Sequence, residues 1–525
     1  MRREKTGRIN RLLFGVYLIA VWAAFFFLHT NSRSVFFGML VIAAAVLYFI
    51  TPWLFGWIRR LCLPAPERDS LAAVCIAAFF ATAAVLAIWR WATWPGGFSV
   101  DSAFQLSQAV SGHYNDWHPV WHTLLFFWLP VTLTGDPYSL FVFQDLVFSA
   151  SMAYMVATVY TLGGKRSAQL AWAYIMLNPF VCFTAMFPFK DIPFALSAMT
   201  AATLAVQNWC ARGVGEDKPL RWISLGIALA NATLFRHNGI LFSGILLTAL
   251  LFSMRKKTWI KTAAVFAVTV ILVRGPLYSA LSVSSAENRT GETMGLPLSV
   301  IGNVVIECPE KLDAETAEFV YAIAPQEKWV SSFQRGNYNA LKWDGANPNP
   351  IEDAGPMRIL RMAWHSFRCA PRAATAGFID LTDIVYGLDQ PLDSTGLPYW
   401  NDGGDSRLVR TEDPRLCEAL ELYMECLRAS PFRYLFSIGA SMLLVLSAAL
   451  ARCDLRKRED RERIGIVLSL FCYNFGTMLL LTGPDARLFL ESFLVCPVFV
   501  LLMLYQREPS ADSEGGEGNK GVCTL

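Results

Sequence analysis

The sequence predicts an all-α polytopic membrane protein with about twelve transmembrane helices, and two observations carry this prediction. First, 54% of the 525 residues are hydrophobic and only 17% are charged, which exceeds the apolar content that a soluble core needs. Second, apolar runs of about 17 to 25 residues, the length of a membrane-spanning helix, recur along the chain. The formal net charge of +3 indicates no nucleic-acid partner. We therefore expect a multi-pass protein of the cell membrane.

The first apolar run comes directly after the basic stretch MRREKTGRINR. No small-residue cleavage site follows this run before the next one begins, so we expect it to be retained as a helix. The expected spans lie at 11–30, 35–58, 70–92, 138–161, 168–187, 191–209, 220–236, 238–254, 258–276, 431–452, 464–482 and 486–505. They divide the chain into two N-terminal helices (1–69), a membrane core (70–276), a water-facing insert (277–430), C-terminal helices (431–506) and a polar, Gly-rich tail (507–525) that is expected to be disordered.

One apolar run, PVWHTLLFFWLPVTLTG at 119–135, decides the topology. It contains Pro130 and is too short to cross about 30 Å of hydrocarbon comfortably at 1.5 Å per residue, so we expect a juxtamembrane helix. The short basic loops, such as GGKRS, MRKK and RCDLRKREDRER, then all lie on the side of the N-terminus. Because basic loops remain in the cytoplasm, both termini are expected to be cytoplasmic and the loop 93–137 extracytoplasmic.

Five outward loops are then expected at one membrane surface. They are the loop 93–137, FPFKDIPF, FRHNG, the insert 277–430 and TGPDARLFLES. The extracytoplasmic insert has mixed polar sequence and a predicted helix at 413–428, and it contains Cys308, Cys369, Cys417 and Cys426. Two alternatives remain open for these cysteines: disulfides in one of three connectivities, or four free thiols.

At VDSAFQ…HYNDWHPVWHTLL the sequence resembles the GT-C superfamily of polytopic glycosyltransferases, and especially a bacterial group with a D-S-x-x-Q then D-W-H-P-V signature. The resemblance covers the topology of most of the chain from residue 70 onward, with its motifs in a few loops, and leaves the first two helices unexplained. It implies transfer of a hexosyl or pentosyl group from a polyprenyl-phosphate-linked sugar. The implied acceptor is a cell-envelope glycan or lipid on the extracytoplasmic face.

The resemblance also implies site residues. In that superfamily an acidic residue of the first large outer loop acts on the acceptor or holds a metal, and an H-P element starts a juxtamembrane helix. Asp101 and His118 match these positions. A second outer-loop aspartate matches Asp191, and a late arginine of a D-x-R-Y-like element matches Arg487, although Leu488 stands where an aromatic residue is usual.

The chemistry of such a transfer needs a cation and a base. A departing lipid phosphate gains negative charge in the transition state, and a preorganised cation stabilises it. Lys190, Arg236 and Arg487 are the candidate phosphate-binding residues on the expected outer face. The acceptor hydroxyl needs a base, for which Asp101 is the first choice and Asp191 the second. A divalent cation, Mg²⁺ or Mn²⁺, held by Asp101 is a further alternative.

Four more polar residues are candidates for binding or positioning the acceptor: Gln105, Asp116, His118 and His237. Some have structural alternatives. Gln105 follows Ser102 at the spacing of a capping box, and His118 fits a capping position before a helix-starting proline. His118 and His122 have the i, i+4 spacing of zinc ligands, without an evident third ligand.

Charged residues in or near the spans have alternatives as well. Arg487 and Glu491 are spaced i, i+4 and can form a local ion pair. Asp145 lies inside an expected span, so it is either paired or faces a cavity. Arg90 lies near a helix end, where snorkelling suffices to explain it.

Two other functions fit the same residues. One is a polymerase or ligase of surface polysaccharide that transfers an oligosaccharide from the lipid donor. The other is a flippase for a lipid-linked sugar, which needs similar cations. Against a flippase, the sequence shows no inverted repeat, and its polar groups gather on one face instead of the midplane.

Overall fold

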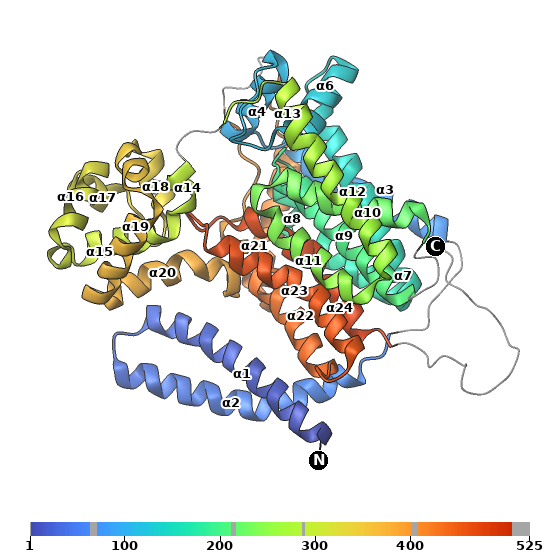
Figure 1. Ribbon diagram of the computed structural model, residues 1–525, viewed down its shortest axis with the longest axis horizontal. Coiled ribbons are helices and arrows are strands. Elements are labelled where there is room, and N and C mark those ends of the chain that lie inside the picture. Colours follow the sequence, from blue (N-terminus) through green and yellow to red (C-terminus); the bar gives the residue numbers. More distant parts are fainter. Residues whose placement is uncertain (1, 64–70, 212–216, 286–288, 402–406, 507–525) are drawn as a thin grey trace, which may run out of the picture.

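The computed structural model describes residues 2–63, 71–211, 217–285, 289–401 and 407–506. Throughout these ranges the chain forms helices joined by short loops, without an extended strand (Figure 1). Six of the described helices are long and apolar enough to cross a membrane: Gly7–His29, Arg33–Arg60, Leu71–Ala92, Ser139–Met176, Lys256–Ala280 and Ala486–Leu504. The structure is therefore that of an all-α chain with membrane-spanning segments. The count of twelve spans stays a prediction, because the remaining spans fall in shorter or less apolar helices.

The membrane core follows the N-terminal pair α1 (Arg2–His29) and α2 (Arg33–Arg60). It comprises α3 (Leu71–Ala92), α4 (Val100–Ser111), α5 (Val120–His122), η1 (Thr123–Trp128), α6 (Leu129–Thr134), α7 (Ser139–Met176), α8 (Pro179–Ala185), α9 (Asp191–Ala211), α10 (Pro219–Phe235), η2 (His237–Gly239), α11 (Ile240–Ser253), α12 (Lys256–Leu272), η3 (Val273–Leu277) and α13 (Tyr278–Ala280). It is completed by α22 (Ile438–Arg452), α23 (Arg458–Met478), η7 (Ala486–Phe489) and α24 (Glu491–Leu504). The central helices α9 and α24 are buried along almost their whole length.

The segment GGKRS, expected as a loop between two spans, lies where α7 is divided into two helical stretches. Gly164 has non-helical backbone angles at this point, with a positive φ of 75° that suits a residue without a side chain. The expected span 168–187 is in turn interrupted after Met176. Asn178 caps a new helix with its side chain, and Pro179 occupies the first position of α8, a pair of residues that favours a helix start.

The run at 119–135 is helical, as α5, η1 and α6, and it returns the chain to the end of the bundle where it started. Trp94, just after α3, stacks on Tyr138, just before α7, with ring centroids 5.7 Å apart. The end of α3 and the start of α7 are therefore neighbours. A segment that connects two adjacent helix ends does not carry the chain across the bundle, which agrees with a juxtamembrane position.

The short basic loops meet at the opposite end of the bundle. Arg59 Nε donates to the carbonyl of Ala451 at 2.8 Å, and Arg463 Nη1 donates to the carbonyl of Tyr505 at 3.3 Å. These bonds tie together the ends of α2, α22, α23 and α24. These basic helix ends therefore lie together, and their cytoplasmic side, which the positive-inside rule predicts, stays a prediction.

Arg90 and Asp145 form a buried ion pair between α3 and α7. The guanidinium meets both carboxylate oxygens, at 2.5 and 2.6 Å, and also donates to the carbonyl of Pro95 at 2.6 Å. Arg90 is only 3% exposed, so the snorkelling interpretation is wrong. Asp145 is therefore paired. The pair fixes the C-terminal end of α3 against α7, because a bidentate contact determines the orientation of the two side chains as well as their distance.

The insert is helical in its described residues. It contains α14 (Arg289–Thr293), α15 (Gly295–Glu307), η4 (Pro309–Lys311), α16 (Ala314–Ile323), α17 (Gln326–Ser332), α18 (Tyr338–Trp343), α19 (Asn349–Cys369), α20 (Pro371–Tyr386), η5 (Leu392–Ser394), α21 (Pro414–Ala429) and η6 (Pro431–Phe436). The helices α14 to α19 form a lobe beside the bundle (Figure 1), with a separate core around the fully buried Trp329. The helix expected at 413–428 is α21. All four cysteines of the insert are free thiols.

Candidate functional site

Six of the predicted site residues meet at one end of the bundle. They are Asp101, His118, Lys190, Asp191, Arg236 and Arg487, and they come from five separate segments of the chain. Arg487 has the largest number of partners among them. Its guanidinium lies 2.6 Å from Asp485, 3.3 Å from Asp101 and 4.0 Å from Asp191.

Asp101 is the most accessible of these carboxylates apart from Asp485. It stands in the first turn of α4, where the helix dipole favours a negative charge. Ser99 caps this helix by accepting a bond from the backbone of Ser102 at 3.1 Å. One carboxylate oxygen of Asp101 faces Arg487, and the other lies 3.7 Å from His118 Nε2. Its side chain is 28% exposed and borders a cavity, so a hydroxyl group can reach it.

His118 lies between Asp101 and Lys190 and is 4% exposed. Its Nδ1 is 3.2 Å from Lys190 Nζ, which donates because a lysine ammonium has no lone pair to accept with. Burial, assisted by the charge of Lys190, holds the pKa of His118 well below its usual range. The ring is therefore neutral at pH 7, and its remaining proton is on Nε2, the atom that faces Asp101.

Lys190 precedes α9 and is partly buried. Burial and the nearby Arg236 guanidinium lower the pKa of its ammonium to about 8. Lys190 is consequently cationic at pH 7 and loses its charge in mildly alkaline solution. Neither Lys190 nor His118 lines the cavity, but His118 lies between Lys190 and Asp101, which does, so the charge of Lys190 acts on a ligand over a distance instead of by direct contact.

Asp191 and Arg236 form a buried ion pair below the cavity. Asp191 is 2% exposed. Arg236 also donates to Asn238 at 3.1 Å and lies over the ring of Phe194, 5.8 Å from its centroid. Neither member of the pair lines the cavity. The geometry therefore favours Asp101 over Asp191 as a base, and it gives Arg236 a supporting position beneath Arg487.

The local ion pair that the spacing of Arg487 and Glu491 allows is not formed, so this interpretation is wrong. The residues Ala486–Phe489 form a 3-10 turn, η7, and α24 begins only at Glu491, so the two side chains do not share one helix face. Arg487 turns outward and lies over the ring of Phe189, 4.6 Å from its centroid. Glu491 is fully buried and accepts a bond from Ser492 at 3.1 Å.

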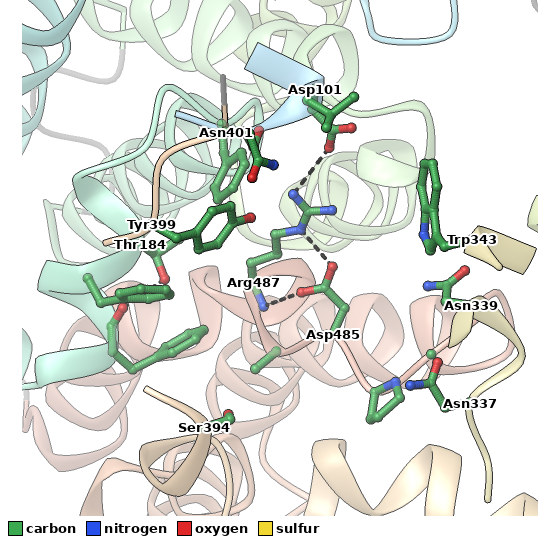
Figure 2. Close-up of a pocket in the computed structure, with 18 residues that line it drawn as sticks. Asp101, Thr184, Asn337, Asn339, Trp343, Ser394, Tyr399, Asn401, Asp485 and Arg487 are labelled. Carbon is green, nitrogen blue, oxygen red and sulfur yellow. Dashed lines mark hydrogen bonds and ion pairs between the residues drawn. The ribbon is translucent and has the colours of Figure 1, made fainter. Parts of the chain in front are cut away.

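A cavity of about 480 Å³ opens between the bundle and the insert (Figure 2). Asp101, Asp485 and Arg487 are its charged residues and are called its floor here. Figure 2 shows the Arg487 guanidinium between the two carboxylates. The insert contributes one part of the walls, with amide, hydroxyl and aromatic side chains: Asn337, Asn339, Trp343, Ser394, Tyr399 and Asn401. The bundle contributes another part, which is mainly aromatic: Phe180, Phe183, Thr184 and Phe189. This size and this mixture of apolar walls with a few polar groups are typical of a small-molecule site.

No family model, curated protein or solved structure matches this chain. The site is therefore interpreted from its own geometry.

The remaining predicted residues lie outside the cavity lining. Gln105 is not part of a capping box, because Ser99 caps α4; it accepts bonds from His122 Nδ1 at 2.7 Å and from Thr123 at 3.3 Å. It thereby holds α4 against α5 and η1.

Asp116 and His237 have other neighbours. Asp116 accepts a bond from the hydroxyl of Tyr278 at 3.0 Å, and the same hydroxyl accepts from the backbone of Val120 at 3.2 Å. His237 lies 3.3 Å from Arg274 at an exposed position. Both residues connect the loops around the site. Among the residues with described positions, no group of three or more His, Cys, Asp or Glu side chains has the arrangement of a metal site.

Proposed function

We propose that this protein is a membrane glycosyltransferase of the GT-C type, which transfers a sugar from a polyprenyl-phosphate donor to a cell-envelope acceptor on the extracytoplasmic face. One observation carries the proposal. An accessible carboxylate, Asp101, and a guanidinium, Arg487, lie 3.3 Å apart at the floor of a cavity although 386 residues separate them in the chain. A base and a cation side by side are what the transfer needs.

The chemical roles follow from this geometry. Asp101 accepts the proton of the acceptor hydroxyl, whose oxygen forms a bond to the anomeric carbon of the donor sugar. The bond between that carbon and the phosphate oxygen breaks, and polyprenyl phosphate leaves with its electron pair. Arg487 stabilises the growing charge on the phosphate, with the charges of Lys190 and Arg236 close behind it.

The direct test uses the purified full-length protein in liposomes with a panel of polyprenyl-phosphate-linked sugars. We expect release of polyprenyl phosphate together with glycosylation of an added envelope extract. The lipid-linked sugar that accumulates in a deletion strain identifies the donor to test first. Movement of an intact donor between leaflets without cleavage would contradict the proposal and favour a flippase.

The proposed topology makes a separate prediction. A cysteine in place of the exposed His113 should react with a membrane-impermeant maleimide in intact cells, in a background whose other exposed cysteines are replaced by serine. A cysteine in place of the exposed Lys457, at the basic end, should react only after the cells are permeabilised. The reverse pattern of labelling would overturn the topology.

Lys190 provides a test of the cations behind Arg487. Lys190→Gln should raise the donor KM and lower kcat, with a loss of about tenfold in kcat/KM, because the phosphate charge is larger in the transition state. The pKa of Lys190, about 8, adds a pH signature. The wild-type rate should fall as pH rises through about 8, since the ammonium loses its proton there.

Lys190→Arg is the matched variant, since its charge persists above pH 8. It should restore only part of the rate, because a planar fork replaces a compact ammonium, but its rate should not fall in the alkaline range. An unchanged alkaline limb in this variant would show that another group titrates.

A further inference from the structure

The two N-terminal helices contain a second and larger cavity, away from the site. The hairpin packs on α22 through Phe14, Phe55 and Ile58. A groove of about 750 Å³ runs between the two helices, lined on each by a stripe of residues spaced three or four apart. Phe14 does not line the groove, because it faces α22. On α1 the stripe is Arg8, Arg11, Leu12, Gly15, Val16 and Ile19, and on α2 it is Ala44, Leu47, Tyr48, Thr51 and Pro52, with Phe49 beside it.

The groove is apolar along most of its length and basic at one end. Gly15 keeps it open, because no other atom lies within 4 Å of the place where a Cβ would stand. Tyr48 and Phe49 are largely exposed on its α2 side. Arg8 and Arg11 project from the same stripe of α1 at its first turns. The groove therefore offers a long hydrocarbon surface that ends at two guanidinium groups.

Among the residues whose side chains the structure describes, these two cations have no acidic partner. The sequence has no Asp or Glu between Lys5 and Pro66. Arg8 forms no ion pair with any residue in the described ranges, and Arg11 donates only its Nε, to the carbonyl of Gly7 at 3.1 Å. Unneutralised guanidinium groups at the end of an apolar groove match a ligand with an anionic head and a hydrocarbon tail.

The length of the groove indicates which kind of tail fits. Eleven helical steps separate Arg8 from Ile19, which is about 16 Å at 1.5 Å per residue. Half of a hydrocarbon core of about 30 Å has nearly the same thickness. A ligand with its head at Arg8 and its tail along the groove would therefore span one leaflet, as a membrane phospholipid does.

We infer that this groove binds an anionic phospholipid, with the phosphate at Arg8 and Arg11 and an acyl chain over Gly15 and Ile19. The inference does not depend on the enzymatic activity proposed above. It assigns a role to the two helices that the resemblance leaves unexplained: they hold one lipid of defined charge against the bundle.

Native mass spectrometry of the full-length protein in detergent tests this site, with phosphatidylglycerol and phosphatidylcholine of identical acyl chains as probes. The wild-type protein should retain one phosphatidylglycerol and little phosphatidylcholine. Each of Arg8→Gln and Arg11→Gln should weaken phosphatidylglycerol retention about fivefold, since a basic residue contributes that much near anionic lipid. The lysine variants should retain most of the lipid. Arg33→Gln, at the other end of the hairpin, is the control and should retain it fully.

The acyl-chain contact has its own matched pair. Gly15→Leu fills the groove and should abolish retention, whereas Gly38→Leu, also with open space around it but outside the groove, should not. The inference is overturned if phosphatidylcholine is retained equally, if Arg33→Gln loses as much lipid as Arg8→Gln, or if Gly15→Leu retains it. Stronger retention of polyprenyl phosphate than of phosphatidylglycerol would also overturn it. Thermal unfolding checks that each variant is folded, and the lysine variants keep the test decisive if a glutamine variant is not.

Discussion

Asp101→Asn should reduce the rate of sugar transfer by at least about 100-fold while the protein stays folded. The amide keeps the shape of the side chain and removes the oxygen that accepts the proton. Folding should be preserved because the carboxylate is partly exposed and contributes only about 0.3–1 kcal/mol at a helix N-terminus. The measurements are initial rates of polyprenyl phosphate release and the midpoint of thermal unfolding.

Glu327→Gln is the matched control for this variant. Glu327 is likewise an acid in the first turn of a helix, α17, but it is exposed in the insert and outside the cavity lining. Its neutralisation should leave the rate unchanged. Near wild-type turnover by the Asp101→Asn protein would remove this residue from the mechanism, and a parallel loss in the Glu327→Gln protein would indicate a general effect of charge.

Arg487→Gln is the second substitution with a large expected effect, a loss of about 10² to 10³-fold in kcat. It removes the cation that contacts Asp101 and Asp485 and lies over Phe189. Arg487→Lys keeps the charge but cannot contact two carboxylates in the same fork geometry, so it should recover only part of the rate.

Asp485→Asn separates charge from orientation at Arg487. It removes the closest partner of the guanidinium, at 2.6 Å, but leaves the cation in place. We therefore expect a smaller loss than for Arg487→Gln. If Asp485→Asn were the more damaging of the two, Asp485 and not Arg487 would be the group that acts on the substrate.

The sequence predicted the floor of the site because its residues belong to short polar loops between apolar helices. Lys190, Arg236 and Arg487 each follow or precede an apolar run, so the parity of the spans was sufficient to place them on one face with Asp101. The structure confirms that these four residues lie together. The number of spans before a residue indicates the membrane face on which it lies, but not how deeply its side chain is buried. Arg236 is buried in an ion pair, whereas Arg487 reaches the cavity.

The walls of the cavity could not be predicted in the same way. Asn337, Asn339 and Trp343 lie in RGNYNALKW, a stretch of the insert without apolar periodicity, so nothing in it indicates which side chains face the bundle. Local spacing was also a poor guide near the site. The serines at 99 and 102 offer two start positions for α4, and the 3-10 turn at Arg487 breaks the i, i+4 relation on which the expected ion pair depended.

The large separation in the chain between Asp101 and Arg487 has a consequence for biosynthesis. A ribosome releases Asp101 early and Arg487 only after the whole insert has been made, so an incomplete chain has the carboxylate without its guanidinium partner. The insert, which supplies part of the walls of the cavity, is also translated between the two. Under the proposed mechanism, premature termination anywhere before residue 487 therefore yields a chain without the cation that the transfer needs. The cell would then need no separate inhibitor or maturation step to keep nascent chains catalytically inactive.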